Sequence, residues 1–239
     1  MQEPLTIGIV GGMSPESTAI YYQHIVRHHQ LAFHDHSYPR IIITSVSFQQ
    51  YIEWQHDQAW QQIAEGLEQE FGRLAAAGAD FAILATNTMH KVLPWIKTSI
   101  PVLSILEVVA DYCRTKGLST IALTGTRFTM SDGFYAHGLE GYGLEVIIPD
   151  ASQQDQIHRI IYEELIAGVV KPDSVKAFAQ IGRDLSARGA QAILLGCTEL
   201  VMLVENDPTE LNTIDSTRLH AEAAWRKAVG RLWRCTKVV

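Results

Sequence analysis

Short apolar runs alternate with longer amphipathic stretches along almost the whole chain. The run TIGIVGG at residues 6–12 ends in glycines, and the stretch that follows it repeats Tyr21, Ile25 and Val26 with a helical period. Between residues 57 and 77 apolar side chains recur at every third or fourth position, which predicts a long helix. Further strands are predicted at residues 41–48, 81–86, 101–105, 120–126, 145–149 and 192–197, and further helices at 153–168 and 173–188.

This alternation of strands and helices is typical of parallel sheets, because a parallel connection needs a crossover that is usually a helix. The strands are apolar throughout rather than at alternate positions, which indicates that both of their faces are buried. The predicted fold class is therefore α/β, with parallel sheets flanked by helices.

Two parts of the chain repeat each other. The stretch LAAAGADFAILAT at residues 74–86 superposes without a gap on LSARGAQAILLGC at residues 185–197, so that Thr86 falls on Cys197. TIGIVGGM superposes likewise on TIALTGTR, in the same order along the chain. Paired matches of this kind indicate an internal duplication and predict two similar α/β lobes.

The duplication divides the chain into an N-terminal lobe, residues 1–112 with 217–239, and a C-terminal lobe, residues 113–216. The last segment is assigned to the first lobe because a final helix, capped by Asp215 or Ser216, is expected to pack back on it. The apolar residues of that helix are Leu219, Ala223, Val229 and Leu232. Because ligands of parallel sheets bind at the carboxyl ends of the strands, we expect the active site in a cleft between the lobes.

Composition limits the kind of protein further. The chain has 239 residues, of which 47% are hydrophobic and 19% charged, and a formal net charge of -7. An acidic chain without a basic patch argues against a nucleic-acid partner. The N-terminus lacks the pattern of a signal peptide, and no apolar run reaches the ~20 residues of a membrane span. We therefore expect a cytoplasmic protein without a membrane partner.

The three cysteines are Cys113, Cys197 and Cys235, and their wide spacing predicts neither a disulfide framework nor a metal site. Only Cys197 stands at a strand end inside a repeated polar cluster. A position before a helix N-terminus lowers the pKa of a thiol, which favours Cys197 as a nucleophile or general base. The alternative for Cys197 is a small buried core residue, and structural or incidental roles are expected for the other two.

The stretches GGMSPEST, TNTMH and GCTE resemble the pyridoxal-independent aspartate/glutamate racemase superfamily over nearly the whole chain. The resemblance implies two pseudo-symmetric α/β lobes, no cofactor, and one cysteine on each side of the substrate Cα. The family's first cysteine falls on Thr86 here, and its second falls on Cys197. This pair resembles a bacterial subgroup of L-aspartate/glutamate-specific racemases, which implies a site that works mainly on the L enantiomer.

The resemblance also implies which residues contact the substrate. These residues are Met13, Ser14, Gln55, Asn87, Thr88, Thr126 and Thr198. Asn87, Thr88 and Thr198 would hold the α-carboxylate. Gln55 stands where the family often places a basic side chain against the distal carboxylate. Ser14 is equally suited to cap the helix that follows it.

The residues of the two clusters differ in the chemistry they can perform. A thiol ionises after a modest shift of its pKa, whereas a threonine hydroxyl does not ionise at physiological pH. Cys197 is therefore the expected base, and Thr86 could relay a proton from water. Glu199 is either a partner of Cys197 or a carboxylate favoured by a helix dipole. His90 is expected to be a core or capping residue rather than a catalyst.

The predicted function is a cofactor-independent racemase that acts at Cα of L-aspartate or L-glutamate, with a homodimer as a possible assembly. An arylmalonate-type decarboxylase or isomerase of the same superfamily would also use one cysteine, and turnover of a malonate would identify it. A non-catalytic amino-acid-binding protein would bind L-glutamate without exchanging its α-proton. A dinucleotide enzyme is disfavoured because GIVGGMS lacks the full GxGxxG spacing.

Overall fold

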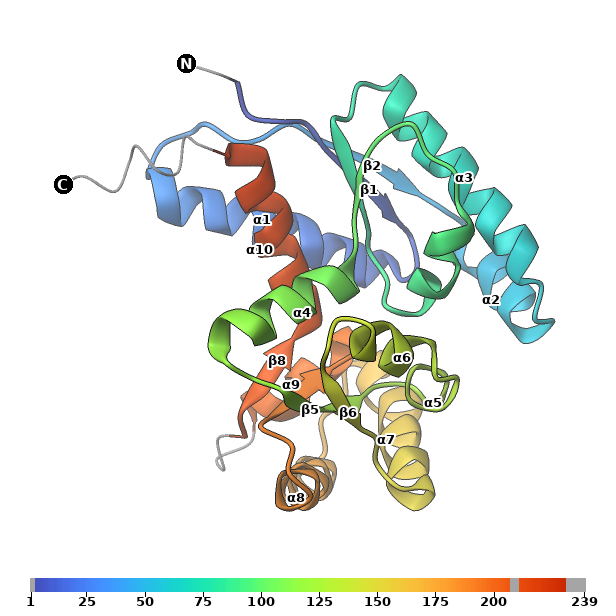
Figure 1. Cartoon of the computed structure of the whole chain (residues 1–239), viewed down its shortest axis with the longest axis vertical. Coiled ribbons are helices and arrows are strands. Elements are labelled where there is room, and N and C mark those ends of the chain that lie inside the picture. The colour runs from blue at the N-terminus through green and yellow to red at the C-terminus, as the bar shows by residue number, and fades with distance from the viewer. Residues whose placement is uncertain (1–2, 207–210, 231–239) are drawn as a thin grey trace. The chain divides into compact units, whose positions relative to one another are not determined.

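The computed structural model describes residues 3–206 and 211–230, and the chain forms two compact units (Figure 1). Unit 1 comprises Met1–Ile105 with Thr217–Val239, and unit 2 comprises Leu106–Ser216. Leu232 and Cys235, considered above, lie outside the described residues. Each unit contains one parallel four-stranded sheet flanked by helices, so the predicted α/β class is confirmed.

The sheet of unit 1 has the strand order β2-β1-β3-β4. Its strands are β1 (Ile7–Gly11), β2 (Ile41–Ser45), β3 (Phe81–Leu84) and β4 (Val102–Leu103). Successive side chains of a strand point to opposite faces, and β1 follows this rule. Ile9 packs in the core beneath α1 (Pro15–Phe33) and α10 (Ser216–Val229), whereas Val10 packs in the core beneath α2 (Phe48–His56) and α3 (Trp60–Ala76). Figure 1 shows these helix pairs on the two sides of the sheet.

The sheet of unit 2 repeats this arrangement in the order β6-β5-β7-β8. Its strands are β5 (Thr120–Thr124), β6 (Glu145–Ile147), β7 (Ala192–Leu195) and β8 (Thr213–Asp215). The helices are α4 (Ile105–Lys116), α5 (Arg127–Ser131), α6 (Phe134–Glu140), α7 (Ala151–Glu163), α8 (Pro172–Ala187) and α9 (Val201–Glu205). Buried residues of α7 and α8, such as Ile157 and Phe178, pack on Ile193 of β7. In both sheets the four strands, counted along the chain, are arranged in the order second, first, third, fourth, as a duplicated chain should show.

Glycines at the ends of the first strands bring the next helix close to the sheet. A Cβ atom added to Gly11 would lie 2.4 Å from Cγ2 of Thr18, and one added to Gly125 would lie 3.2 Å from Cγ2 of Thr129. Thr18 Oγ1 accepts a hydrogen bond from Gly12 N at 2.8 Å and donates one to Ser14 O at 2.9 Å. The absence of a side chain at Gly11 therefore allows the β1–α1 loop to close tightly.

The final helix α10 packs on the sheet of unit 1, as expected for the last helix of the chain. Its buried residues are Ala221, Ala224, Trp225, Ala228 and Val229. Leu219 and Ala223, which the sequence placed on the packed face, are only partly buried. The difference arises because small alanines allow α10 to approach Ile7 and Phe81 closely, with Trp225 filling the remaining space.

Several boundaries differ from the predicted ones. The strand predicted at 41–48 ends at Ser45, because Phe48 already begins α2. The helix predicted at 57–77 begins at Trp60 and ends at Ala76. Neither α2 nor β8 was predicted. Among the described residues, we find no helix with the length and apolarity that a bilayer crossing requires.

Candidate active site

The first polar cluster follows β3 in unit 1. Ala85 N donates to Val10 O at 2.8 Å, which continues the pairing of β3 with β1 by one residue. Thr86 N then donates to Leu84 O at 2.9 Å, so the chain turns sharply at Ala85. The side chain of Thr86 is partly exposed, whereas Asn87 is buried. The strand end thus holds Thr86 in a tight, hydrogen-bonded turn.

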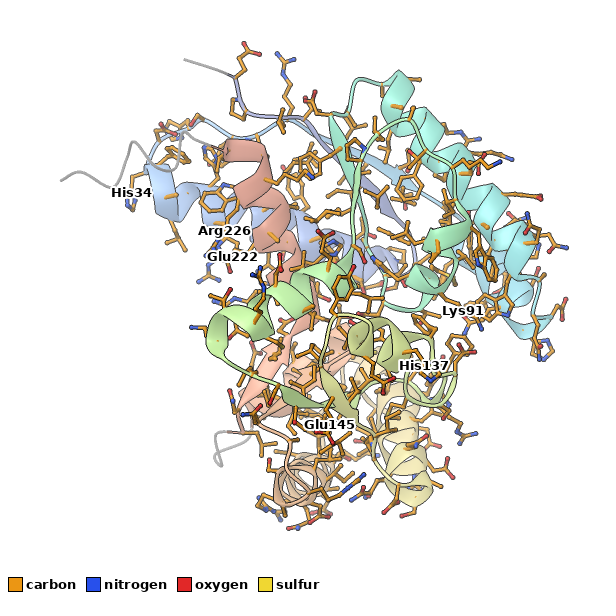
Figure 2. All side chains as sticks on the ribbon, in the orientation of Figure 1. His34, Lys91, His137, Glu145, Glu222 and Arg226 are labelled. Atoms are coloured by element: carbon orange, nitrogen blue, oxygen red, sulfur yellow. The ribbon has the colours of Figure 1, made fainter. Side chains whose placement is uncertain are left out.

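The residues after Thr86 form the 3₁₀ helix η1 (Thr88–Trp95), and Asn87 occupies its N-cap position. Thr88 is partly exposed at the first position of this helix. Lys91, labelled in Figure 2, places its Nζ 4.1 Å from the centroid of the Trp60 ring. A cation over an aromatic face is held by the ring quadrupole, so the ammonium of Lys91 is packed against α3.

The loop after β1 contributes two further predicted residues. Ser14 caps α1, because its Oγ accepts a hydrogen bond from Ser17 N at 3.2 Å. Met13 is 5% exposed and belongs to the core beneath α3, with Val10 and Tyr51. The cap of α1 therefore accounts for Ser14, and the side chain of Met13 is directed into the protein interior.

The corresponding loop of unit 2 has the same kind of cap. Thr126 Oγ1 accepts a hydrogen bond from Thr129 N at 3.3 Å and begins α5. Thr124 of β5 pairs with Leu195 of β7, so the Thr126 loop and the second polar cluster leave the sheet at the same edge. This edge is the carboxyl end of the strands, where parallel sheets bind ligands.

The second polar cluster follows β7. Cys197 Sγ donates to Glu199 Oε2 at 2.9 Å, and Thr198 Oγ1 donates to the same oxygen at 2.8 Å. Gly196 N donates to Thr124 O at 2.8 Å, in the same way that Ala85 N donates to Val10 O in unit 1. A thiol and a hydroxyl therefore converge on one carboxylate oxygen, and Glu199 is a partner of Cys197.

The charge state of Cys197 differs from the prediction. Burial, and then the adjacent Glu199 carboxylate, raises the pKa of the Cys197 thiol well above its ordinary value. The expected lowering by a helix N-terminus is wrong for this structure, because η3 (Thr198–Leu200) is only 3 residues long. A hydrogen bond from the backbone of Glu199 acts in the lowering direction but is the weaker effect. The resting group is a thiol next to an acceptor for its proton.

Polar residues of α7 extend this cluster, and sequence reasoning missed them. His158 Nδ1 accepts a hydrogen bond from Arg127 N at 3.3 Å, and Arg127 Nη2 lies 2.8 Å from Oδ1 of Asp155. The rings of His158 and Tyr162 are 4.5 Å apart. Burial, and then the neighbouring Cys197 and Glu199, raises the pKa of the Tyr162 hydroxyl. The available signal was the spacing of Asp155, His158 and Tyr162. They are three and four residues apart, which places them on one face of α7.

Gln55 lies in the last turn of α2 and is partly exposed. Near this helix, β2, α2 and α3 surround a polar groove of about 670 Å³, lined by Ser45, Tyr51, Glu70 and Arg73 together with neighbouring residues. None of the residues predicted to bind substrate lines this groove. Within residues 3–206 and 211–230, no three His, Cys, Asp or Glu side chains are grouped in a way that could hold a metal ion.

Comparison with known proteins places these features in context. The family model described as Asp/Glu/Hydantoin racemase matches residues 10–224. A candidate Asp/Glu racemase from Yersinia pestis has 37% sequence identity and a TM-score of 0.88, over 94% of this chain and 99% of that one. An aspartate racemase homologue from Pyrococcus horikoshii has 31% identity and a TM-score of 0.84, over 95% and 99%. The broad specificity amino-acid racemase RacX of Bacillus subtilis is 27% identical over 227 residues, 91% of this chain and 95% of RacX.

Proposed function

Because this chain belongs to the Asp/Glu/hydantoin racemase family, we propose that it is a cofactor-independent amino-acid racemase acting at Cα of L-aspartate or L-glutamate. In this proposal Cys197 removes the Cα proton, and Thr86 serves the opposite face of the substrate. The observation that carries the proposal is the 2.9 Å contact between Cys197 Sγ and Glu199 Oε2 at the end of β7. This contact pairs the thiol with a group that can take its proton.

The proton transfers can be written in order. Glu199 takes the thiol proton, and the resulting thiolate of Cys197 takes the proton from Cα, which leaves a carbanion on the substrate. Water delivers a proton to the other face of Cα through the hydroxyl of Thr86, and the product is the D enantiomer. The proton held by Glu199 neutralises the hydroxide through solvent, which restores the resting thiol and carboxylate.

The proposal predicts unequal use of the two enantiomers. A thiol next to a carboxylate can become a base, whereas the hydroxyl of Thr86 ionises far above physiological pH. The L enantiomer, which presents its α-proton to Cys197, should therefore react well, and the D enantiomer poorly. Thr86 and Cys197 belong to different units, so the proposal requires that one substrate meets both loops.

The test is Cα deuterium exchange, followed by proton NMR in heavy water for each enantiomer of aspartate and glutamate. We expect faster exchange from the L enantiomers in the wild type. Cys197→Ser should reduce this exchange by about 10²–10⁴-fold, because serine is a far weaker base of similar size. Cys113→Ser is the matched control: Cys113 is a fully buried residue of α4 whose thiol pKa burial raises to about 11, so its loss should leave exchange near the wild-type rate.

Each other outcome has a distinct meaning. Exchange that persists in a folded Cys197→Ser variant would refute the cysteine mechanism. Turnover of an arylmalonate without exchange of amino acids would identify a decarboxylase. Binding of L-glutamate without any exchange would identify an amino-acid-binding protein.

A further inference from the structure

His90 links the turn at Thr86 to Ile105, the last residue of the first segment of unit 1. It is 2% exposed, and its Nε2 accepts a hydrogen bond from Ile105 N at 3.1 Å. Since a backbone N–H can only donate, the ring proton of His90 is on Nδ1. That Nδ1–H donates to Thr86 O at 2.7 Å. Burial lowers the pKa of His90 to about 4, so near neutral pH the ring is uncharged and keeps this tautomer.

A second buried histidine packs against His90 and holds the opposite tautomer. His220 Nε2 lies 2.9 Å from Leu103 O, which can only accept, so the ring proton of His220 is on Nε2. Its Nδ1 accepts from the hydroxyl of Tyr21 at 2.9 Å. The rings of His90 and His220 meet edge to face with their centroids 5.8 Å apart. His220 thus shares the environment of His90, while its own ring nitrogens bind Leu103 and Tyr21.

Resting on the function proposed above, we propose that His90 is the positioning residue of Thr86, and that its Nδ1–H fixes the direction of the Thr86 hydroxyl. Both peptide groups that flank the side chain are held, because Thr86 N donates to Leu84 O at 2.9 Å and Thr86 O accepts from His90. Threonine is branched at Cβ and has few χ1 rotamers once its backbone is fixed. The hydrogen bond to His90 therefore holds the backbone from which the hydroxyl projects, and with it the few directions that the hydroxyl can take.

The duplicated cluster of unit 2 differs at this point. The position that the repeat equates with His90 is Val201, which has no side-chain donor. The carbonyl of Cys197 instead accepts from Leu200 N at 3.2 Å, within the turn itself. A side-chain donor, itself held by Ile105 N, therefore accompanies the threonine copy of the cluster, where a weak relay group depends most on accurate placement.

Two substitutions separate the two hydrogen bonds of His90. In His90→Gln the longer amide reaches the place of Nε2, so it keeps the acceptor for Ile105 N and loses the donor to Thr86 O. In His90→Asn the shorter amide occupies the place of Nδ1, so it keeps the donor to Thr86 O and loses the acceptor for Ile105 N. Each variant leaves one buried backbone group unpaired, and both should therefore lose stability to a similar extent.

The measurement compares two products formed from L-glutamate in heavy water. Deuterium that enters remaining L-glutamate reports the Cys197 face alone, whereas deuterated D-glutamate reports delivery on the Thr86 face. His90→Gln should lower the ratio of inversion to retention by ~10- to 100-fold, the effect of misplacing a reacting group by about an ångström. His90→Asn should keep the wild-type ratio, and so should His220→Gln, which changes the neighbouring ring without touching Thr86.

Equal ratios in the wild type and His90→Gln, or equal losses in both His90 variants, would overturn the positioning role while leaving exchange by Cys197 intact. Exchange without any inversion in the wild type would also overturn it. A wild type without Cα exchange would instead overturn the proposed function itself. Should His90→Gln fail to fold, nitrogen-15 NMR of the wild type provides a second test: a His90 ring protonated on Nε2 rather than Nδ1 refutes the inference.

Discussion

His220 should make unit 1 less stable in mild acid, and removal of its imidazole should remove the part of that sensitivity that His220 contributes. Burial, and then the neighbouring His90, lowers the folded-state pKa of His220 from 6.5 to about 3. As the pH falls below 6.5, the unfolded chain protonates this ring while the folded protein does not. The free energy of unfolding therefore decreases with falling pH across this window, and the full stability is present only above it.

The size of the effect follows from the two pKa values. A group that is protonated only in the unfolded state contributes a slope of about 1.4 kcal/mol per pH unit. Between pH 6.5 and 4.5, His220 should therefore reduce the stability of the wild type by about 2 kcal/mol. His90, whose folded-state pKa is about 4, contributes a similar amount over the same range. The variant His220→Gln loses the contribution of His220 and keeps that of His90.

Tryptophan fluorescence can follow this unfolding, because the described tryptophans all lie in unit 1: Trp54, Trp60, Trp95 and Trp225. Urea unfolding would be measured between pH 4.5 and 7 for the wild type, His220→Gln, and His56→Gln, which changes an exposed ring. The stability difference between wild type and His220→Gln should shrink by about 2 kcal/mol toward pH 4.5. The stability difference between the wild type and His56→Gln should stay constant between pH 4.5 and 7. If the stability difference between the wild type and His220→Gln does not change with pH, the conclusion that His220 is buried in its neutral form is refuted.

Two further predictions concern the polar clusters. Thr86→Cys should add a base on the second face and raise Cα exchange from D-glutamate and D-aspartate by about 10²–10⁴-fold. Thr86→Ala, the control, should not raise it. An unchanged rate of exchange from the D enantiomers in folded Thr86→Cys would count against a one-sided site. Glu199→Gln removes the charge that helps to raise the pKa of Cys197, so iodoacetamide should alkylate this thiol faster near neutral pH while racemisation slows. Peptide mass spectrometry measures the alkylation, and a rate equal to that of the wild type would show that Glu199 does not control the thiol.

The positions of the strands could be read from the sequence because most of them are continuous apolar runs. β3 and β7 end just before Thr86 and Cys197, where the runs give way to polar clusters. β8 escaped detection because Thr213–Asp215 contains a single apolar residue, Ile214, and so forms no apolar run. α2 was missed because it begins three residues after β2, so its first apolar residue, Phe48, extends the apolar pattern of the strand.

Only those residues of the candidate site that the internal repeat aligns with each other could be predicted from the sequence. The duplication singles out Thr86 and Cys197, but the protonation of the thiol depends on how Glu199 is oriented and how deeply the sulfur is buried. The tautomer of His90 is set by Ile105, which is fifteen positions away in the chain and has no recognisable motif. The polar face of α7 with Tyr162 comes close to Cys197 only through the packing of unit 2, which no local pattern encodes.

The packing of α10 on unit 1 determines the order in which the two units can fold during synthesis. Unit 2 is one uninterrupted segment, Leu106–Ser216, whereas unit 1 needs residues from both sides of it. A ribosome releases the chain from its N-terminus, so unit 2 has left the ribosome before Ala221, Ala224 and Trp225 can cover Ile7 and Phe81. The part of this sheet face that α1 does not cover therefore stays exposed until the last helix has been made. The half of the protein that is begun first is the half that is able to finish folding last.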